Sequence, residues 1–113
     1  MKFNINPEIE TGFRDFIVDG VNIPIEYQRY EGKASSYLEY YTWLIKPDNY
    51  SDDTPKVWIV YGTLDVYSKG NFKNILQKAV ERLLELGFSV TDIEKEDYDD
   101  DTKYYHIPIN FYK

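Results

Sequence analysis

VYGTLDVYSKGNFKNILQKAVERLLELGF, residues 60–88, changes from the period of a strand to the period of a helix within one short turn. Before the turn, alternate residues share a face, and one face is expected to carry Trp58, Val60, Leu64 and Val66. After it, apolar residues recur three and four apart, which predicts an amphipathic helix over about 71–86. Its apolar face is expected to carry Phe72, Ile75, Leu76, Ala79, Val80, Leu83 and Leu84. We therefore expect the helix to fold back over the strand and to end before Gly87.

A second helix is predicted over about 7–19. Asn6 is a suitable cap and Pro7 suits the first helical position. Further strands are expected over 22–30, 37–45, 57–67, 88–93 and 103–112. Pro108 lacks a backbone donor, so the last strand is expected at a sheet edge. The pattern predicts a single α+β domain over 1–113, with a mainly antiparallel sheet of four to five strands and both helices packed on it.

Composition narrows the classes of function. The formal net charge is −7, so gripping nucleic acid by its phosphates is disfavoured, since that requires a basic surface. The chain has no cysteine and no run of 18 apolar residues, so we expect no disulfides, no thiol chemistry and no membrane. Twelve tyrosines fit either a docking surface or ordinary sheet faces, because tyrosine combines an apolar body with a polar tip.

No residue pattern predicts catalysis, a cofactor or a metal site. His106 is the only histidine and has no cysteine to pair with, so a structural or solvated role is favoured. The turn at 68–71, SKGN, has one glycine and places its lysine before it, unlike a phosphate-binding loop. The acidic run at 94–101 lacks the spacing of a calcium loop and is expected to be an extended, solvated connection.

Several segments, in this order and spacing, carry a resemblance. They are IPIEY at 23–27, the tyrosine-rich strand from 37, GTLDVYSKGNF at 62–72, LGF at 86–88, and DTKYYH at 101–106 before the terminal strand. Together they resemble the tail-completion, or tail-terminator, proteins of long-tailed bacteriophages and prophages. The resemblance covers nearly the whole chain, although Gly12 interrupts the first helix.

The resemblance implies a structural protein and not an enzyme. Such proteins form a ring, typically hexameric, on the head-proximal end of the tail tube, where the ring stops tube growth and joins the head. The implied partners are other copies of the chain, the tail tube protein and a head-completion or connector protein. DNA passes through the lumen without specific binding. The implied locations are the host cytoplasm during assembly and then the head–tail junction of the virion.

Two sets of residues are candidates for these contacts. The strand face opposite the helix is expected to contribute to the subunit interface, unless a second helix covers it; its residues are Tyr41, Tyr61, Asp65, Tyr67 and Lys69. The acidic loop is expected at the lumen or a ring end; its residues are Asp97, Asp99, Asp100 and Asp101. The rival hypotheses are a small acidic phage inhibitor that mimics DNA and blocks a host defence protein, and a small enzyme.

Overall fold

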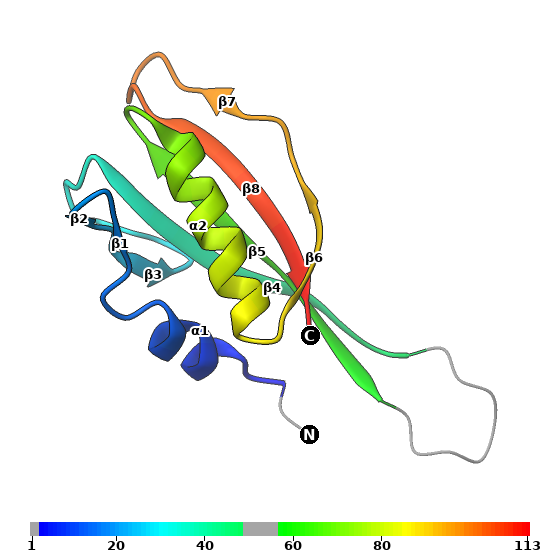
Figure 1. The fold of residues 1–113 in the computed structure, drawn as a ribbon. Helices are drawn as coiled ribbons and strands as arrows, with labels where there is room; N and C mark the ends of the chain where they lie inside the picture. Colours follow the sequence, from blue (N-terminus) through cyan, green and yellow to red (C-terminus); the bar gives the residue numbers. More distant parts are fainter. Residues whose placement is uncertain (1–2, 49–56) are drawn as a thin grey trace.

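The computed structural model describes residues 3–48 and 57–113 and has an α+β fold (Figure 1). Its helices are α1 (Asn6–Gly12) and α2 (Phe72–Glu85), and a small hairpin is formed by β1 (Ile17–Val18) and β2 (Val21–Asn22). The main sheet has six strands, in the order β3-β4-β5-β8-β6, with β7 also paired to β8. They are β3 (Ile25–Tyr27), β4 (Ser36–Pro47), β5 (Trp58–Ser68), β6 (Ser89–Ile93), β7 (Asp97–Tyr98) and β8 (Tyr105–Tyr112).

The predicted antiparallel sheet of four to five strands is wrong in strand number and in direction. Strands β4 to β8 pair antiparallel, but β3 runs parallel to β4, with Ile25 opposite Leu38, so the sheet is mixed. The strand predicted over 22–30 is divided, because Asn22 pairs within the small hairpin and only Ile25–Tyr27 joins the main sheet. The predicted acidic loop likewise includes β7, the sixth strand.

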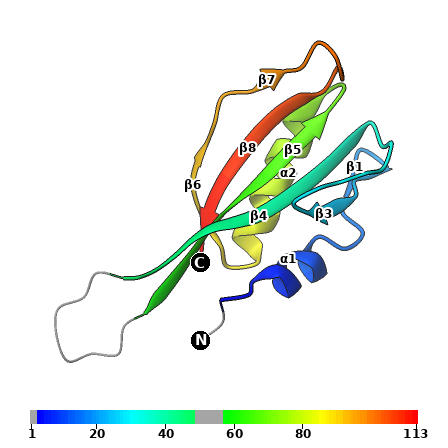
Figure 2. The ribbon, with the colours of Figure 1, turned by 180° about the vertical axis from the view of Figure 1, so that it is seen from behind.

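Both helices lie on one face of the main sheet (Figures 1 and 2). Helix α2 covers Phe72–Glu85, one residue shorter at each end than predicted, and Gly87 follows it with a φ of +88°. Ile75, Ala79 and Leu83 are buried against the sheet, whose inner residues Val60, Leu64 and Val66 are buried as predicted. Several of the residues predicted between helix and strand are less buried than expected. Phe72, Leu76 and Val80 are only partly buried, Leu84 is 55% exposed, and Trp58 is 38% exposed and contacts Phe3.

Helix α1 is shorter than the predicted 7–19 and ends at Gly12. Asn6 is its first residue and not its cap; the Asn6 backbone N–H donates to Asn4 Oδ1 at 3.1 Å. Beyond the helix, Asp15 has a φ of +55°, which a right-handed helix cannot contain. The turn points both Phe13 and Phe16 into the core, where their rings meet edge to face. A turn, and not the longer helix that their spacing suggested, therefore buries both phenylalanines.

Strand β8 is not the edge strand that Pro108 suggested. It lies between β5 and the β6–β7 side, with Pro108 opposite Asp65. The Pro108 carbonyl accepts the Glu94 N–H at 2.9 Å, which places the proline's main-chain polar groups on the β6–β7 side. The paired residues of that side are interrupted between Ile93 and Asp97. The missing donor therefore falls at a gap in the neighbouring strands.

Strands β4 and β5 run to one end of the sheet as an arm, residues 43–48 and 57–59 (Figure 1). Its outer pairs, Lys46 with Ile59 and Pro47 with Trp58, extend beyond β8 as a two-stranded hairpin. The arm begins at a bulge, because Thr42 pairs with Gly62 whereas Leu44 pairs with Tyr61, which leaves Trp43 without an opposite residue. The radius of gyration is 15.2 Å, against about 13 Å for a compact chain of this length. The fold is therefore elongated along this hairpin.

Candidate functional site

The face of the main sheet opposite the helices is open; no helix in the described part of the chain covers it (Figure 2). Strand register arranges its side chains in cross-strand rows. One row is Tyr37, Tyr67 and His106, and another is Tyr41, Thr63 and Asn110. The alternative that a second helix covers this face does not occur among residues 3–48 and 57–113. We call this surface the open face.

A ladder of stacked rings crosses one end of the open face. Tyr30 stacks on Tyr37 at 4.4 Å between ring centroids, Tyr37 on Tyr67 at 4.7 Å, and Tyr67 on His106 at 4.5 Å. Tyr104 meets Tyr37 edge to face at 5.2 Å and donates its hydroxyl to the Ala34 carbonyl. Burial raises the pKa of Tyr37 to about 12 and also raises that of Tyr67. Tyr37 and Tyr67 therefore stay protonated at neutral pH.

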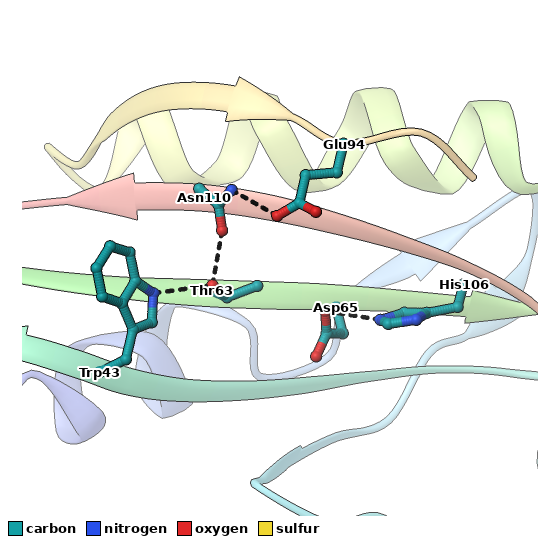
Figure 3. Close-up of polar contacts among 6 residues, drawn as sticks. All are labelled: Trp43, Thr63, Asp65, Glu94, His106 and Asn110. Atoms are coloured by element: carbon teal, nitrogen blue, oxygen red, sulfur yellow. Dashed lines mark hydrogen bonds and ion pairs between the residues drawn. The ribbon is translucent and has the colours of Figure 1, made fainter. Parts of the chain in front are cut away.

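His106 closes this ladder and is held by Asp65 (Figure 3). Its Nε2 lies 2.8 Å from Asp65 Oδ1, and the Asp65 side chain is only 10% exposed. The hydrogen bond to Asp65 raises the pKa of His106, against the opposing effect of burial, and the charges of Asp65, Asp97 and Glu39 act in the same direction as the bond. His106 is therefore tied into the open face by a charge-assisted bond and a stacking contact.

A second polar chain crosses the sheet further along (Figure 3). Trp43 Nε1 donates to Thr63 Oγ1 at 3.0 Å, and the Thr63 hydroxyl donates to Asn110 Oδ1 at 2.7 Å. The Asn110 amide then donates to Glu94 Oε2 at 2.9 Å and to Asp92 Oδ2 at 3.1 Å. Because Thr63 is only 3% exposed, these bonds satisfy a buried hydroxyl and link the bulged strand to the acidic side of the sheet.

The structure brings some of the predicted interface residues together and separates others. Asp65 and Tyr67 belong to the ladder end, and Lys69 Nζ lies 4.9 Å from the ring centroid of Tyr104 there. Tyr41 lies in the Thr63 row, and Tyr61 contacts Trp43 and Tyr112 at the base of the arm. All five were predicted on this side of the sheet, but they span its length.

The acidic loop is more ordered than predicted. Asp97 belongs to β7 and pairs with His106, so this part of the loop is held against β8 and is not a free connection. Asp99 Oδ1 accepts the backbone N–H of Asp101 at 2.9 Å and of Thr102 at 3.4 Å, which forms a turn. Asp97, Asp99, Asp100 and Asp101 are exposed, in agreement with the predicted solvation. Asp97 and Asp99 line a pocket on the open face, whereas Asp100 and Asp101 do not.

The arm was not singled out from the sequence, yet it carries the densest exposed apolar surface. Its exposed large apolar residues are Trp43, Leu44, Ile45, Val57 and Trp58. Phe3, 47% exposed, adds an edge-to-face contact with Trp58 at 5.5 Å. Clustered exposed apolar side chains of this kind mark interaction sites. An available signal was that these β-favouring residues flank a loop rich in proline, aspartate and serine.

Comparison with known proteins adds no assignment. A scan against protein-family models finds no match, and a search of curated proteins finds no significant match. Within the described residues, no group of three or more histidine, cysteine, aspartate or glutamate side chains is arranged to hold a metal ion. Neither described helix is long and apolar enough to cross a membrane.

Proposed function

We propose that this protein is a ring-forming tail-completion, or tail-terminator, protein of a long-tailed phage or prophage. Copies of the chain assemble on the head-proximal end of the tail tube, about six to a ring, and stop tube growth. The ring then presents the surface that a head-completion or connector protein binds. The role is structural and not enzymatic. The chain acts in the host cytoplasm during assembly and at the head–tail junction of the virion.

The observation that carries this proposal is the arm. A ring of identical subunits needs two different surfaces that fit each other, because its contacts are head to tail. The arm supplies one surface, with Val57 51% and Leu44 40% exposed, and the ladder end of the open face, at the opposite end of β4 and β5, supplies a second. A projecting apolar hairpin is suited to reach a neighbouring copy, since burial of its side chains would drive association.

The charge distribution also supports a role around DNA. Asp97, Asp99, Asp100 and Asp101 are exposed on one short segment, β7 and the turn after it. In a ring, each of these charges would be repeated about six times around the axis. Facing the lumen or a ring end, they would repel DNA phosphates and let DNA pass without specific binding.

Native mass spectrometry and negative-stain electron microscopy over a range of protein concentrations test the proposal. The expected particle is a ring with about six times the 13.5 kDa mass of one chain. If the protein remains a monomer or dimer, alone and with its tail tube protein, the ring proposal is wrong. A monomer or dimer that binds a host nuclease would instead favour the inhibitor that mimics DNA.

Substitutions test which surfaces make the ring. Leu44→Lys with Val57→Lys should abolish rings, because it places two charges on the apolar arm. Lys69→Glu with Asp65→Ala should do the same from the open face. Leu84→Lys is the control, since Leu84 is also an exposed leucine but lies on α2. Circular dichroism checks each fold, and rings that persist in the arm variant would exclude the arm as an interface.

A further inference from the structure

The open face contains a pocket at its ladder end, with a volume of about 280 Å³. We call it the tyrosine pocket. Seven described residues line it: Tyr37, Tyr67, Asp97, Asp99, Thr102, Tyr104 and His106. They come from β4, β5, β7, β8 and the turn between β7 and β8, so residues far apart in sequence build one cavity.

The walls of the tyrosine pocket are fixed by contacts within the chain. Tyr37 and Tyr67 are parallel to within 13°, and Tyr104 stands nearly perpendicular to them, at 77° and 90°. His106 is held by its bond to Asp65 and by stacking on Tyr67. Because these rings support one another, the pocket does not have to be ordered by its ligand, which reduces the entropic cost of binding.

The chemistry of the tyrosine pocket favours a positive guest. Asp97 and Asp99 place carboxylates on its wall. The faces of Tyr37 and Tyr67 are already covered by their stacking neighbours, so the carboxylates provide the attraction for a cation. No lysine or arginine is among the seven lining residues; Lys69 lies on the Tyr104 ring outside them. Even with His106, Lys69 and the neighbouring Lys103 all charged, the four carboxylates of Asp97, Asp99, Asp65 and Glu39 leave a net charge of −1.

We propose that the tyrosine pocket is a docking site for a lysine or arginine side chain of a partner protein. An anionic guest would meet the carboxylates, and an uncharged apolar guest would leave them without a counter-charge. A guanidinium or ammonium group supplies the positive charge that these carboxylates lack and can donate hydrogen bonds to them. The inference does not depend on ring formation, because any protein that presents a basic side chain could occupy the pocket.

His106 provides a direct measurement, because it is the only histidine of the chain and lines the pocket. Its ring signals are followed by NMR while Nα-acetyl-arginine amide is added at constant pH and ionic strength. We expect a saturable change in the His106 signals. Nα-acetyl-citrulline amide, which has nearly the same shape without the charge, is expected to produce no saturable change.

Two double variants separate the pocket from general electrostatics. Asp97→Asn with Asp99→Asn should weaken binding of the arginine probe about tenfold, which corresponds to about 1.4 kcal/mol. Asp100→Asn with Asp101→Asn removes the same charge from the same turn, outside the pocket, and should leave the affinity unchanged. Magnesium chloride, titrated in the same way, serves as a second control. The proposal is overturned if both variants weaken binding equally, if citrulline or magnesium chloride gives a response equal to that of the arginine probe, or if no saturable change occurs.

Discussion

Replacing Gly62 by alanine tests the packing between the two central strands. A Cβ atom at this position would lie 2.6 Å from the Tyr41 backbone oxygen and 2.7 Å from Cζ of Phe111. Phe111 is fully buried, and the Tyr41 oxygen belongs to the paired strand next to the bulge. Neither neighbour can move away without disturbing the core or the hydrogen bonds between β4 and β5, so we expect Gly62→Ala to destabilise the fold.

The size of the effect follows from these contacts. Overpacking of a core by one methyl group costs about 1–3 kcal/mol, and contact with backbone places Gly62→Ala in the upper part of that range. The unfolded chain of the alanine variant has less conformational entropy than that of the parent, which stabilises the variant by about 0.5 kcal/mol. The net destabilisation is therefore about 2 kcal/mol, which lowers the melting temperature by about 8 °C in a domain of this size.

Thermal unfolding followed by circular dichroism measures this difference. Gly70→Ala is the matched control, because a Cβ there meets no atom within 4 Å and its φ lies outside the left-handed region. The control should be unchanged or slightly more stable. If Gly62→Ala melts within about 2 °C of the parent, the close approach of Tyr41 and Phe111 does not limit packing, and the reasoning is refuted.

Three further predictions concern the core, the histidine and the acidic loop. Leu83→Asp should unfold the domain, because Leu83 is fully buried and an unpaired charge there is costly, whereas Leu84→Asp at the exposed neighbour should melt like the parent. The bond to Asp65 raises the pKa of His106 above its usual value of about 6.5, so its stabilisation is complete below about pH 6.5 and is lost as the pH rises through the folded-state pKa. The urea midpoint of the parent relative to His106→Asn should therefore fall over that range, and a constant difference would exclude the linkage. Neutralising the acidic loop should preserve the fold, since asparagine retains the Oδ1 acceptor of the turn, and should make ring assembly less sensitive to salt and magnesium; unchanged sensitivity would make the loop only a connector. The four substitutions are Asp97→Asn, Asp99→Asn, Asp100→Asn and Asp101→Asn.

The elements that could be predicted from the sequence are those with a long, regular apolar period. Helix α2 and its packing on β5 followed from residues such as Ile75, Ala79 and Leu83, which recur at helical spacing and are buried. The glycine after the helix adopts the expected left-handed conformation. The helical period places Leu84 on the apolar stripe but does not fix the angle at which the sheet meets that stripe, and Leu84 is exposed.

The errors arose where non-local pairing decides the structure. Nothing in the local pattern of Ile25–Tyr27 distinguishes a parallel from an antiparallel neighbour, since three residues carry too little periodicity. Pro108 suggested an edge strand because it lacks a backbone donor. The gap between β6 and β7 that accommodates it depends on how another segment pairs, which the residues around Pro108 do not reveal. Phe13 and Phe16 fitted a helix by spacing, although a turn at Asp15 serves the same burial.

The candidate site shows the same division. The strand alternation placed Asp65 and Tyr67 on the face opposite α2, where they lie. His106 was assigned a structural or solvated role because the chain has no second histidine and no cysteine to pair with it; its partner is Asp65, which reaches it across neighbouring strands, 41 positions away. Register between β5 and β8 creates this pair, and register is a property of the whole sheet.

The position of the tryptophans has a consequence for spectroscopy. Both tryptophans of the chain lie on the arm, and Trp43 and Trp58 remain 51% and 38% exposed in the folded subunit. Indole emission depends on how much water surrounds the ring. In the folded subunit each indole is partly covered, because Trp43 Nε1 donates to the buried Thr63 hydroxyl and Trp58 packs against Phe3. Melting should therefore expose both rings further and shift the emission to the red. An event that covers the arm should shift the emission to the blue, so the direction of the shift distinguishes association from unfolding.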